Sequence, residues 1–353
     1  MSLIPSLLSE FALPGEVHAV ARHEGGHIND SYRVVAGAGM AERTYLLQRL
    51  NLEVFPDPDA VMSNFQIVTA HLAGAVRRRG LSQPERRVPQ LVPTRSGGVM
   101  MRDAQGGVWR LLQFIEGARS TRRAESIEDA RGAGQAVGQF QALLADLSTP
   151  LAETIPGFHD TRARMDALQA AVADDPVNRL AMVSREVGAI LSRREEAERL
   201  EVLRDAGRLQ RRVVHNDAKI ANVLFDKRTR APLCMVDLDT VMPGLVLHDF
   251  GDLVRSIATN AAEDEPDVRR VAVRSHYIEA AMEGYLQEAG AFLTPVERQH
   301  LGLAGRVIAL EQAARFLTDF LEGDHYYQTT RPNQNLDRAR AQYAVYEGLS
   351  VLG

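Results

Sequence analysis

The sequence predicts an α+β protein of two lobes, in which a small antiparallel β-sheet with one main helix precedes a larger, mostly helical part. The chain has 353 residues, of which 45% are hydrophobic, so it can bury two cores. Up to about residue 114, short β-like segments alternate with turns rich in glycine and proline. From about residue 125 onward, apolar residues recur almost throughout with the 3.6-residue period of helices.

The first part contains six segments whose residue types and flanking turns are typical of strands. They are Val17 to Arg22, Ser31 to Val35, Thr44 to Leu50, Gln90 to Val92, Val99 to Arg102 and Trp109 to Phe114. Between the third and fourth segments, Ala60 to Arg79 carries apolar residues at the spacing of one helix face. These features predict an antiparallel sheet with a single helix.

The second part contains six segments with helical periodicity. They are Ala130 to Leu144, Arg162 to Val172, Val183 to Arg204, Asp267 to Glu288, Pro295 to Leu321 and Arg338 to Leu349. Thr294, Pro295 and Glu297 supply an N-cap, a first-turn proline and a glutamate that closes a capping box, so a helix is expected to start there. A hairpin is predicted from Val223 to Val236, and Glu116 to Ser120 is the expected linker between the lobes.

One stretch within the helical part carries the pattern H-x-D-x-x-x-x-N. His215, Asp217 and Asn222 supply it, and Asp237 follows Asn222 by fifteen positions. This pattern places one base, one neutral oxygen ligand and one anionic ligand around a nucleotide-bound metal. An isolated His-Asn-Asp is usually a turn, and an Asp-Leu-Asp is usually a strand end. The combined spacing favours a phosphoryl-transfer site of the kinase type.

Phosphoryl transfer depends mainly on positioning and on neutralisation of charge by the metal. We therefore predict that Asp217 is the base or orienting carboxylate for the acceptor hydroxyl, and that Lys219 neutralises the moving phosphoryl group. Asn222 and Asp237 offer the hard oxygen ligands that suit Mg²⁺. His215 is expected to fix the loop by hydrogen bonds.

Two further carboxylates follow the motif, at Asp239 and Asp249. Asp239 either reaches a second metal or accepts backbone N–H bonds in its own turn, and we favour the structural role. Asp249 precedes a helical run, so it either caps that helix or braces the catalytic loop. Both interpretations of Asp249 are structural.

Two upstream segments are candidates for nucleotide contacts. Glu24 to Tyr32 contains Gly25 and Gly26 and is interpreted as a loop that folds over the phosphates, although Gly-Gly between strands is ordinarily a hairpin turn. The predicted interlobe hinge could pair its backbone with an adenine edge, or could be a plain linker strand. The hinge candidates are Gln113, Phe114 and Ile115.

The composition excludes several classes of partner. With 41 basic and 46 acidic side chains the net charge is -5, so no basic field is available for nucleic acid or an anionic membrane. Cys234 is the single cysteine, which excludes an internal disulfide. The N-terminus lacks a signal-peptide pattern, and no apolar run approaches the roughly 20 residues that span a bilayer. We expect a cytoplasmic protein, monomeric or weakly dimeric, that binds small molecules.

Beyond the catalytic motif, several stretches resemble the aminoglycoside phosphotransferase and choline kinase superfamily, and in particular its N-acetylhexosamine 1-kinases. The resemblance runs along most of the chain. The catalytic pair is common to the whole superfamily, whereas the other stretches are more selective. The matching stretches are Gly26 to Asn29, Leu47 to Asn51, Val54 to Asp57, Phe158 to Thr161, His215 to Asp217, Asp237 to Gly244, Asp249 to Asp252 and Arg315 to Asp324.

The resemblance implies a protein-kinase-like fold, with residues 1–115 as the nucleotide-binding lobe and residues 116–353 as the catalytic and acceptor-binding lobe. It also implies ATP- and Mg²⁺-dependent phosphorylation of a sugar's anomeric hydroxyl, with Asp217 as base and Asp237 on the metal. The sugar contacts that it implies are His27, Asn29, Asp217, Arg315 and Tyr326.

Two of these sugar contacts also have a structural interpretation. Glu311 and Asp319 each lie four residues from Arg315, so Arg315 could belong to an ordinary ion pair on a helix surface. Tyr326 stands beside Tyr327 after a Gly-Asp turn, so it could be a packed loop aromatic.

The chain departs from the superfamily in one respect. Kinases of this fold place a lysine on the third strand, paired to a helix glutamate, to hold the α- and β-phosphates. Here Lys219 and Lys227 are the only lysines, and the third strand carries Gln48 and Arg49. A hydrogen bond between Gln48 and Gln66, or a phosphate contact by Arg49, is the expected substitute.

Three functions compete. A sugar 1-kinase needs a site for a neutral polyhydroxylated acceptor, and Arg315 on the candidate acceptor helix favours it. An aminoglycoside, choline or other amino-alcohol kinase needs a carboxylate-lined pocket or an aromatic cage for its cationic substrate. A nucleotide-binding pseudokinase is suggested by the missing strand lysine and opposed by the intact Asp217, Asn222 and Asp237.

Overall fold

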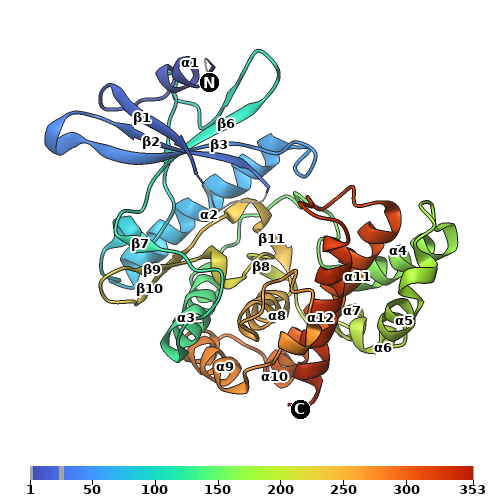
Figure 1. Ribbon diagram of the computed structural model, residues 1–353. Helices are drawn as coiled ribbons and strands as arrows, with labels where there is room; N and C mark the ends of the chain where they lie inside the picture. Colours follow the sequence, from blue (N-terminus) through green and yellow to red (C-terminus); the bar gives the residue numbers. More distant parts are fainter. Residues whose placement is uncertain (1–2, 24–27, 353) are drawn as a thin grey trace.

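The chain folds into an antiparallel β-sheet with one long helix, stacked on a larger helical part, and these are called the sheet region and the helical region below (Figure 1). The computed structural model describes residues 3–23 and 28–352. This arrangement confirms the predicted α+β class. Among the described residues, no helix is long and apolar enough to cross a membrane.

The main sheet has the strand order β1-β2-β3-β6-β4, with β5 also paired to β6, and all its pairs are antiparallel. Its strands are β1 Val17–Arg22, β2 Asp30–Ala36, β3 Arg43–Arg49, β4 Leu91–Val92, β5 Met101–Arg102 and β6 Val108–Gln113. Each overlaps a predicted strand. The register places Gln48 opposite Arg110 and Arg49 opposite Trp109. Because directly opposed residues share a face of a sheet, Gln48 and Arg110 lie on one face and Arg49 and Trp109 on the other.

Helices cover both faces of this sheet. The predicted helix is α2 (Pro58–Arg78), and Asp57 caps its start by accepting the N–H of Ala60 at 3.0 Å. A second helix, α1 (Leu3–Ser9), packs on the opposite face, and the sequence did not predict it because seven residues are too few to show a period. The strand residues buried with α1 include Tyr45, Leu47, Trp109 and Leu111.

The helical region packs around α11, which contacts α4, α8 and α12. Most of its buried apolar side chains form one continuous core. The helices of this region are α3 Ile127–Leu144, α4 Thr161–Asp174, α5 Leu180–Leu191, α6 Arg194–Ala197, α7 Arg199–Asp205, α8 Val246–Ile257, α9 Ser275–Ala289, α10 Pro295–Gln299, α11 Leu301–Glu322 and α12 Gln334–Ser350.

The segment from Val183 to Arg204 is not the single helix that its period predicts. It forms α5, α6 and α7, because no side chain between Ile190 and Ala197 is buried and a straight helix would have nothing to pack against there. Similarly, α9 starts later than expected. Asp267 accepts the N–H of Arg269 at 3.2 Å and so caps a short 3-10 turn ahead of α9.

The predicted helix from Pro295 to Leu321 is interrupted at His300, which separates α10 from α11. Its predicted start is confirmed, since Thr294 and Glu297 form both bonds of a capping box.

Two small antiparallel sheets in the helical region carry the catalytic motif. In the first, β9 pairs with β10, which confirms the predicted hairpin, and β7 pairs with the other edge of β9. The expected linker from Glu116 to Ser120 therefore contains a strand. In the second sheet, β8 pairs with β11. The bounds are β7 Ala118–Arg119, β8 Arg212–Val214, β9 Val223–Asp226, β10 Pro232–Met235 and β11 Met242–Gly244.

The helices α3 and α9 approach so closely that glycines form the contact. A Cβ atom on Gly284 would lie 2.1 Å from the carbonyl oxygen of Arg131, and a Cβ on Gly134 would lie 2.0 Å from that of Ala281. Both distances are far shorter than a van der Waals contact, so no larger residue fits without separating the helices.

Gly284→Ala is therefore expected to lower the free energy of unfolding by about 1–3 kcal/mol, because the α3 backbone has to move away. The matched control is Gly188→Ala in α5, where a Cβ would meet nothing within 4 Å. This control is expected to be neutral or stabilising by up to about 1 kcal/mol, since alanine favours a helix. Urea unfolding measures both variants, and equal losses would contradict the close helix contact.

Candidate active site

The catalytic loop begins where β8 ends, and a buried carboxylate on α8 holds it. Asp249 accepts the N–H of His215 at 2.9 Å and the N–H of Asn216 at 2.7 Å, while Gln141 donates to the same carboxylate at 2.9 Å. Asn216 has a left-handed backbone with φ of 64°. Asp249 thus braces the loop. The alternative role as N-cap is wrong, because α8 begins at Val246 and Asp249 lies in its first turn.

His215 joins the two halves of the motif. Its Nε2 lies 2.9 Å from the carbonyl oxygen of Val236, and its Nδ1 lies 3.3 Å from the backbone nitrogen of Asp217. The side chain is fully buried. These contacts give His215 the loop-fixing role that the sequence predicted.

Asp217 is held as a charged carboxylate by its neighbours. Lys219 Nζ donates to both carboxylate oxygens at 2.9 and 2.7 Å, and Asn222 Nδ2 donates to one of them at 2.8 Å. Burial opposes ionisation, but the Lys219 ammonium outweighs it and lowers the pKa of Asp217 to about 2. The Asp217 side chain keeps 21% of its surface exposed, so a substrate can reach it.

Asp237 lies beside this group and receives no hydrogen bond from the residues that the structure describes. Its backbone is left-handed, with φ of 64° and ψ of 57°, which is uncommon for a residue other than glycine. Desolvation by the surrounding protein raises the pKa of Asp237 to about 6, and the charges of Asp239 and Asp217 act in the same direction. A carboxylate that has no hydrogen-bond partner among the described residues and has two like charges nearby is suited to bind a cation.

The pair of Asn222 and Asp237 fits a hard divalent cation. Asn222 uses its amide nitrogen on Asp217, which leaves its amide oxygen for a metal. Within residues 3–23 and 28–352, no three His, Cys, Asp or Glu side chains converge as a complete metal cage. Mg²⁺ usually takes one or two protein oxygens and completes its coordination with water and substrate phosphates.

Asp239 has a partner that the sequence reasoning did not find. Arg110 on β6 binds it with both terminal nitrogens, at 2.5 and 2.9 Å, and Asn29 donates to it at 2.8 Å. The favoured structural role therefore holds, but through side chains of the sheet region, and the expected bonds to N–H groups of its own turn are absent among the described contacts. The second-metal alternative does not fit, since Arg110 already neutralises Asp239.

The expected hydrogen bond between Gln48 and Gln66 does not form, and a phosphate contact by Arg49 stays a prediction. Gln48 accepts from Arg110 at 2.8 and 3.1 Å and donates to Ser31 at 3.2 Å, whereas Gln66 is exposed on α2. Arg49 lies on the face away from α2, where its guanidinium stacks on the Trp109 ring at 5.9 Å. The prediction for Gln48 is wrong because sheet register, which places Arg110 opposite it, sets its partner.

The hinge leaves one backbone donor free. Gln113 donates its N–H to the carbonyl of Gln90 at 2.8 Å, and Phe114 donates to Thr44 at 3.0 Å. Of the three hinge candidates, only the N–H of Ile115 donates to no acceptor among the described residues. Gly25, Gly26 and His27, the predicted loop and sugar contacts, lie outside the described residues.

Arg315 lies in an aromatic setting on α11, and only 11% of its side chain is exposed. Its guanidinium carbon lies 5.4 Å from the centre of the first ring (Phe158), 5.7 Å from the second (Tyr327) and 6.0 Å from the third (Tyr326). One guanidinium nitrogen lies 3.7 Å from the carboxylate of Glu311. Asp319 is occupied elsewhere, since it accepts three backbone N–H groups from the loop after α11. The ion pair with Glu311 that the structural interpretation allowed therefore forms, but it is buried and not on the helix surface.

His159 connects Arg315 to the catalytic loop. Its Nε2 lies 2.7 Å from the carbonyl oxygen of Asn216, and its Nδ1 lies 3.0 Å from Glu311. Both ring nitrogens face acceptors, so both carry protons. Burial acts against the charge, but the Glu311 carboxylate outweighs it and raises the pKa of His159. The sequence singled out Phe158 to Thr161 only as a matching stretch and did not assign this role.

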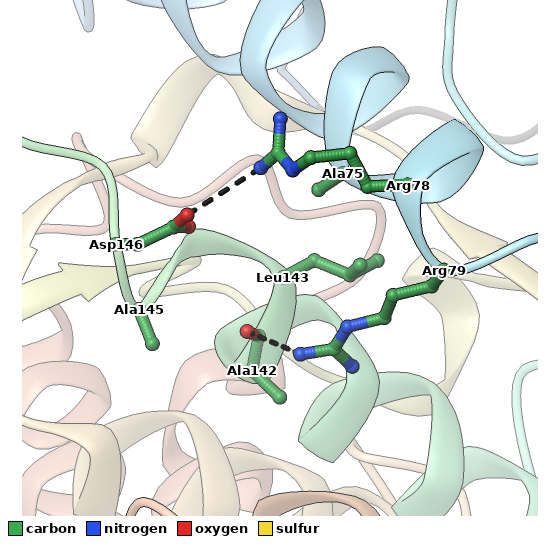
Figure 2. A pocket seen from close by; sticks show the side chains of 7 residues that line it. All are labelled: Ala75, Arg78, Arg79, Ala142, Leu143, Ala145 and Asp146. Carbon is green, nitrogen blue, oxygen red and sulfur yellow. Dashed lines mark hydrogen bonds and ion pairs between the residues drawn. The ribbon is translucent and has the colours of Figure 1, made fainter.

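The surface hollow in Figure 2 lies apart from all these residues. It has a volume of about 330 Å³ and forms where the ends of α2 and α3 meet. There Arg78 pairs with Asp146 at 3.4 Å, and Arg79 donates to the carbonyl of Ala142 at 2.9 Å. Both arginines join the two helices, and none of the predicted site residues lines the hollow.

A two-lobed α+β fold with this loop and a downstream carboxylate defines a phosphotransferase of the aminoglycoside phosphotransferase and choline kinase type. Residues 19–286 match the Phosphotransferase enzyme family, and the chain belongs to that family. The resemblance to the superfamily is thereby confirmed. The narrower likeness to N-acetylhexosamine 1-kinases stays a prediction.

Solved structures of three proteins illustrate the fold. The chain is similar to spectinomycin phosphotransferase in complex with ADP and spectinomycin, with a TM-score of 0.59, 13% identity and 98% of both chains covered. It is similar to a microcompartment-associated aminopropanol kinase, with a TM-score of 0.57, 15% identity, and 99% of this chain and 96% of that chain covered. It is also similar to a choline/ethanolamine kinase family protein from Mesorhizobium loti, with a TM-score of 0.55, 18% identity, and 99% of this chain and 100% of that chain covered. Identities of this size concern the fold alone.

Glu201 on α7 belongs to the buried network behind Arg315. One of its oxygens accepts the N–H of Thr161 at 3.3 Å, and the other is buried and has no hydrogen-bond partner among the described residues. Burial raises the pKa of Glu201 to about 7, and the nearby Glu311 charge acts in the same direction. The folded protein therefore favours protonated Glu201.

Because the folded-state pKa lies above the usual 4.5, the unfolded chain releases the Glu201 proton first as pH rises. This residue's contribution to the free energy of unfolding therefore falls between about pH 4.5 and 7 and stays low above it. The difference in free energy of unfolding between Glu201→Gln and wild type should rise in favour of the variant by on the order of 2–3 kcal/mol from pH 4.5 to pH 8. Urea unfolding across this range measures it, with exposed Glu195→Gln as the control. A difference that does not change with pH would contradict the buried, protonated state.

Proposed function

We propose that the protein is an ATP- and Mg²⁺-dependent kinase that phosphorylates a sugar hydroxyl, namely the anomeric hydroxyl of an N-acetylhexosamine. The observation that carries the proposal is the setting of Arg315. A nearly buried guanidinium, ringed by three aromatic side chains, is tied through Glu311 and His159 to the loop of the catalytic carboxylate. Such a site repels a cationic acceptor and offers hydrogen bonds to hydroxyl and carbonyl oxygens.

The two lobes divide the task. Residues 1–115 bind the nucleotide, and the N–H of Ile115, which has no acceptor among the described residues, is the donor for the adenine edge. Residues 116–353 supply the catalytic and acceptor groups. Asn222 and Asp237 hold Mg²⁺, which when bound neutralises charge on the transferred phosphoryl group.

In the reaction, the acceptor oxygen forms a bond to the γ-phosphorus of ATP, the bond to the β-phosphate oxygen breaks, and ADP leaves. Asp217 orients the acceptor hydroxyl and takes its proton. A pKa of about 2 makes Asp217 a weak base, so its larger effect is orientation, which suits a loose transition state. Lys219 now occupies both carboxylate oxygens, and it frees one for the hydroxyl by moving toward the phosphoryl group.

An amino-alcohol or aminoglycoside kinase is the second candidate, because the solved structures of similar fold include an aminopropanol kinase and a spectinomycin phosphotransferase. The rings of Phe158, Tyr326 and Tyr327 would suit a quaternary amine. Here Arg315 already lies over all three rings, and its neighbour Glu311 is bound by His159 and Thr161. Glu311, the carboxylate beside Arg315, is therefore already paired and not free for a cationic substrate.

An ADP-release screen tests the proposal. N-acetylated hexosamines, plain hexoses, choline and aminoglycosides would each be supplied with ATP and Mg²⁺. The proposal predicts release of ADP that depends on an N-acetylhexosamine. Release with choline or an aminoglycoside alone would overturn it in favour of the second candidate, and binding of ATP without release would favour a pseudokinase.

Asp217→Asn should leave Mg²⁺-ATP binding largely intact and lower turnover about 10²–10⁴-fold, because the hydroxyl loses its orienting carboxylate and proton acceptor. Asp237→Ala should instead abolish the metal-dependent part of ATP binding. Calorimetric titration and steady-state rates measure the two effects separately. Undiminished turnover of the Asp217 variant would remove that residue from its role.

Arg315→Ala should raise KM for the sugar about 10–100-fold with a smaller effect on KM for ATP, since charged hydrogen bonds to the acceptor are lost. The control is Arg340→Ala, which removes a helix arginine outside this site. In the wild type, Arg340 and Glu186 form an ion pair at 2.7 Å. Kinetics and thermal unfolding would be measured for both. An effect of Arg315→Ala on thermal stability alone would assign the residue a structural role.

A further inference from the structure

Arg110 is the most completely enclosed cation in contact with the motif. It is 1% exposed, and the Asp239 side chain that it binds is 2% exposed. Gln48 accepts from two of its nitrogens, and the Phe65 ring lies 5.1 Å from the guanidinium. Every partner except Asp239 comes from the sheet region, so this ion pair crosses between the two regions of the molecule.

Arg110 supplies a buried cation to the face of the sheet on which the strand lysine is missing. Arg110 stands directly opposite Gln48, so the cation sits one strand away from its usual place but on the same face. The carboxylate that pairs with this cation also differs in position from the helix glutamate of other kinases of this fold. It is not on α2, where Gln66 is exposed, but at Asp239, two residues after Asp237.

The bidentate geometry constrains the segment that carries Asp237. Two parallel N–H bonds fix both the direction and the distance of a carboxylate. Asn29 adds a third bond to Asp239, and Thr154 donates to the carbonyl oxygen of the same residue at 3.2 Å. These contacts hold the short turn of residues 238–240, which follows the left-handed Asp237.

We propose that Arg110 and Asp239 are positioning residues for the metal-bound nucleotide. Their ion pair sets the sheet against the helical region and directs Asp237 to the metal. This inference rests on the proposed function. Neither residue touches the reacting atoms, and both act through Asp237.

A double-mutant cycle separates this role from simple stabilisation. Arg110→Gln or Asp239→Asn alone leaves a buried charge without its partner and should destabilise the protein. The pair Arg110→Gln with Asp239→Asn contains no buried charge and should recover most of the stability. The matched control is Arg86→Gln, because Arg86 pairs with Asp226 at 2.6 Å between the same two regions and does not contact the turn after Asp237.

Calorimetric titration with ATP, in Mg²⁺ and in EDTA, would be run on wild type and on each variant, beside urea unfolding. The double variant should lose about 10–100-fold of the Mg²⁺-dependent gain in ATP affinity, as expected when groups that orient a metal ligand are removed. Arg86→Gln should keep that gain. A double variant that binds ATP with the wild-type dependence on Mg²⁺ would overturn the inference alone. A wild-type protein that does not bind ATP would overturn the proposed function as well.

Discussion

The catalytic loop depends on a bond pattern that its own residues do not supply. Asp249 reaches from α8 to accept two consecutive N–H groups, and this keeps Asn216 in its left-handed conformation. Such a conformation is costly and persists only where the surroundings fix it. Loss of the carboxylate would also leave two buried donors without acceptors. The direction in which Asp217 leaves the strand is therefore set by a different helix.

Two further buried contacts bring the rest of the site to this loop. On the side of the proposed acceptor site, His159 binds the carbonyl oxygen of Asn216 and, through Glu311, contacts the helix that carries Arg315. On the other side, the ion pair of Arg110 and Asp239 joins the sheet to the turn after Asp237, the proposed metal ligand. In both, a charged group is buried together with its counter-ion, so a truncation of one partner is more damaging than removal of both.

The contacts within the catalytic loop could be predicted from the sequence because they depend on short spacings. The contacts that support the loop from the sheet could not, because they depend on sheet register. Asn222 donates to Asp217 five residues away, a contact that any loop with this pattern can form. Arg110 meets Gln48 across 62 positions of sequence, and nothing in the local pattern shows which residue of a neighbouring strand stands opposite. Similarly, the 3.6-residue spacing of apolar residues predicted α2 and α3 but not the breaks between α5, α6 and α7. A break depends on what the helix packs against, which the spacing does not show.

The central claim is that this arrangement transfers a phosphoryl group to the anomeric oxygen of a sugar. Phosphorus NMR of one reaction tests it most directly, with ATP, Mg²⁺ and an equal mixture of N-acetylglucosamine, N-acetylgalactosamine, choline and an aminoglycoside. The account predicts a new phosphomonoester signal that is split by the anomeric proton of an N-acetylhexosamine, and no phosphorylated choline or aminoglycoside. A product signal from phosphocholine or a phosphorylated aminoglycoside, with no sugar 1-phosphate, would contradict it.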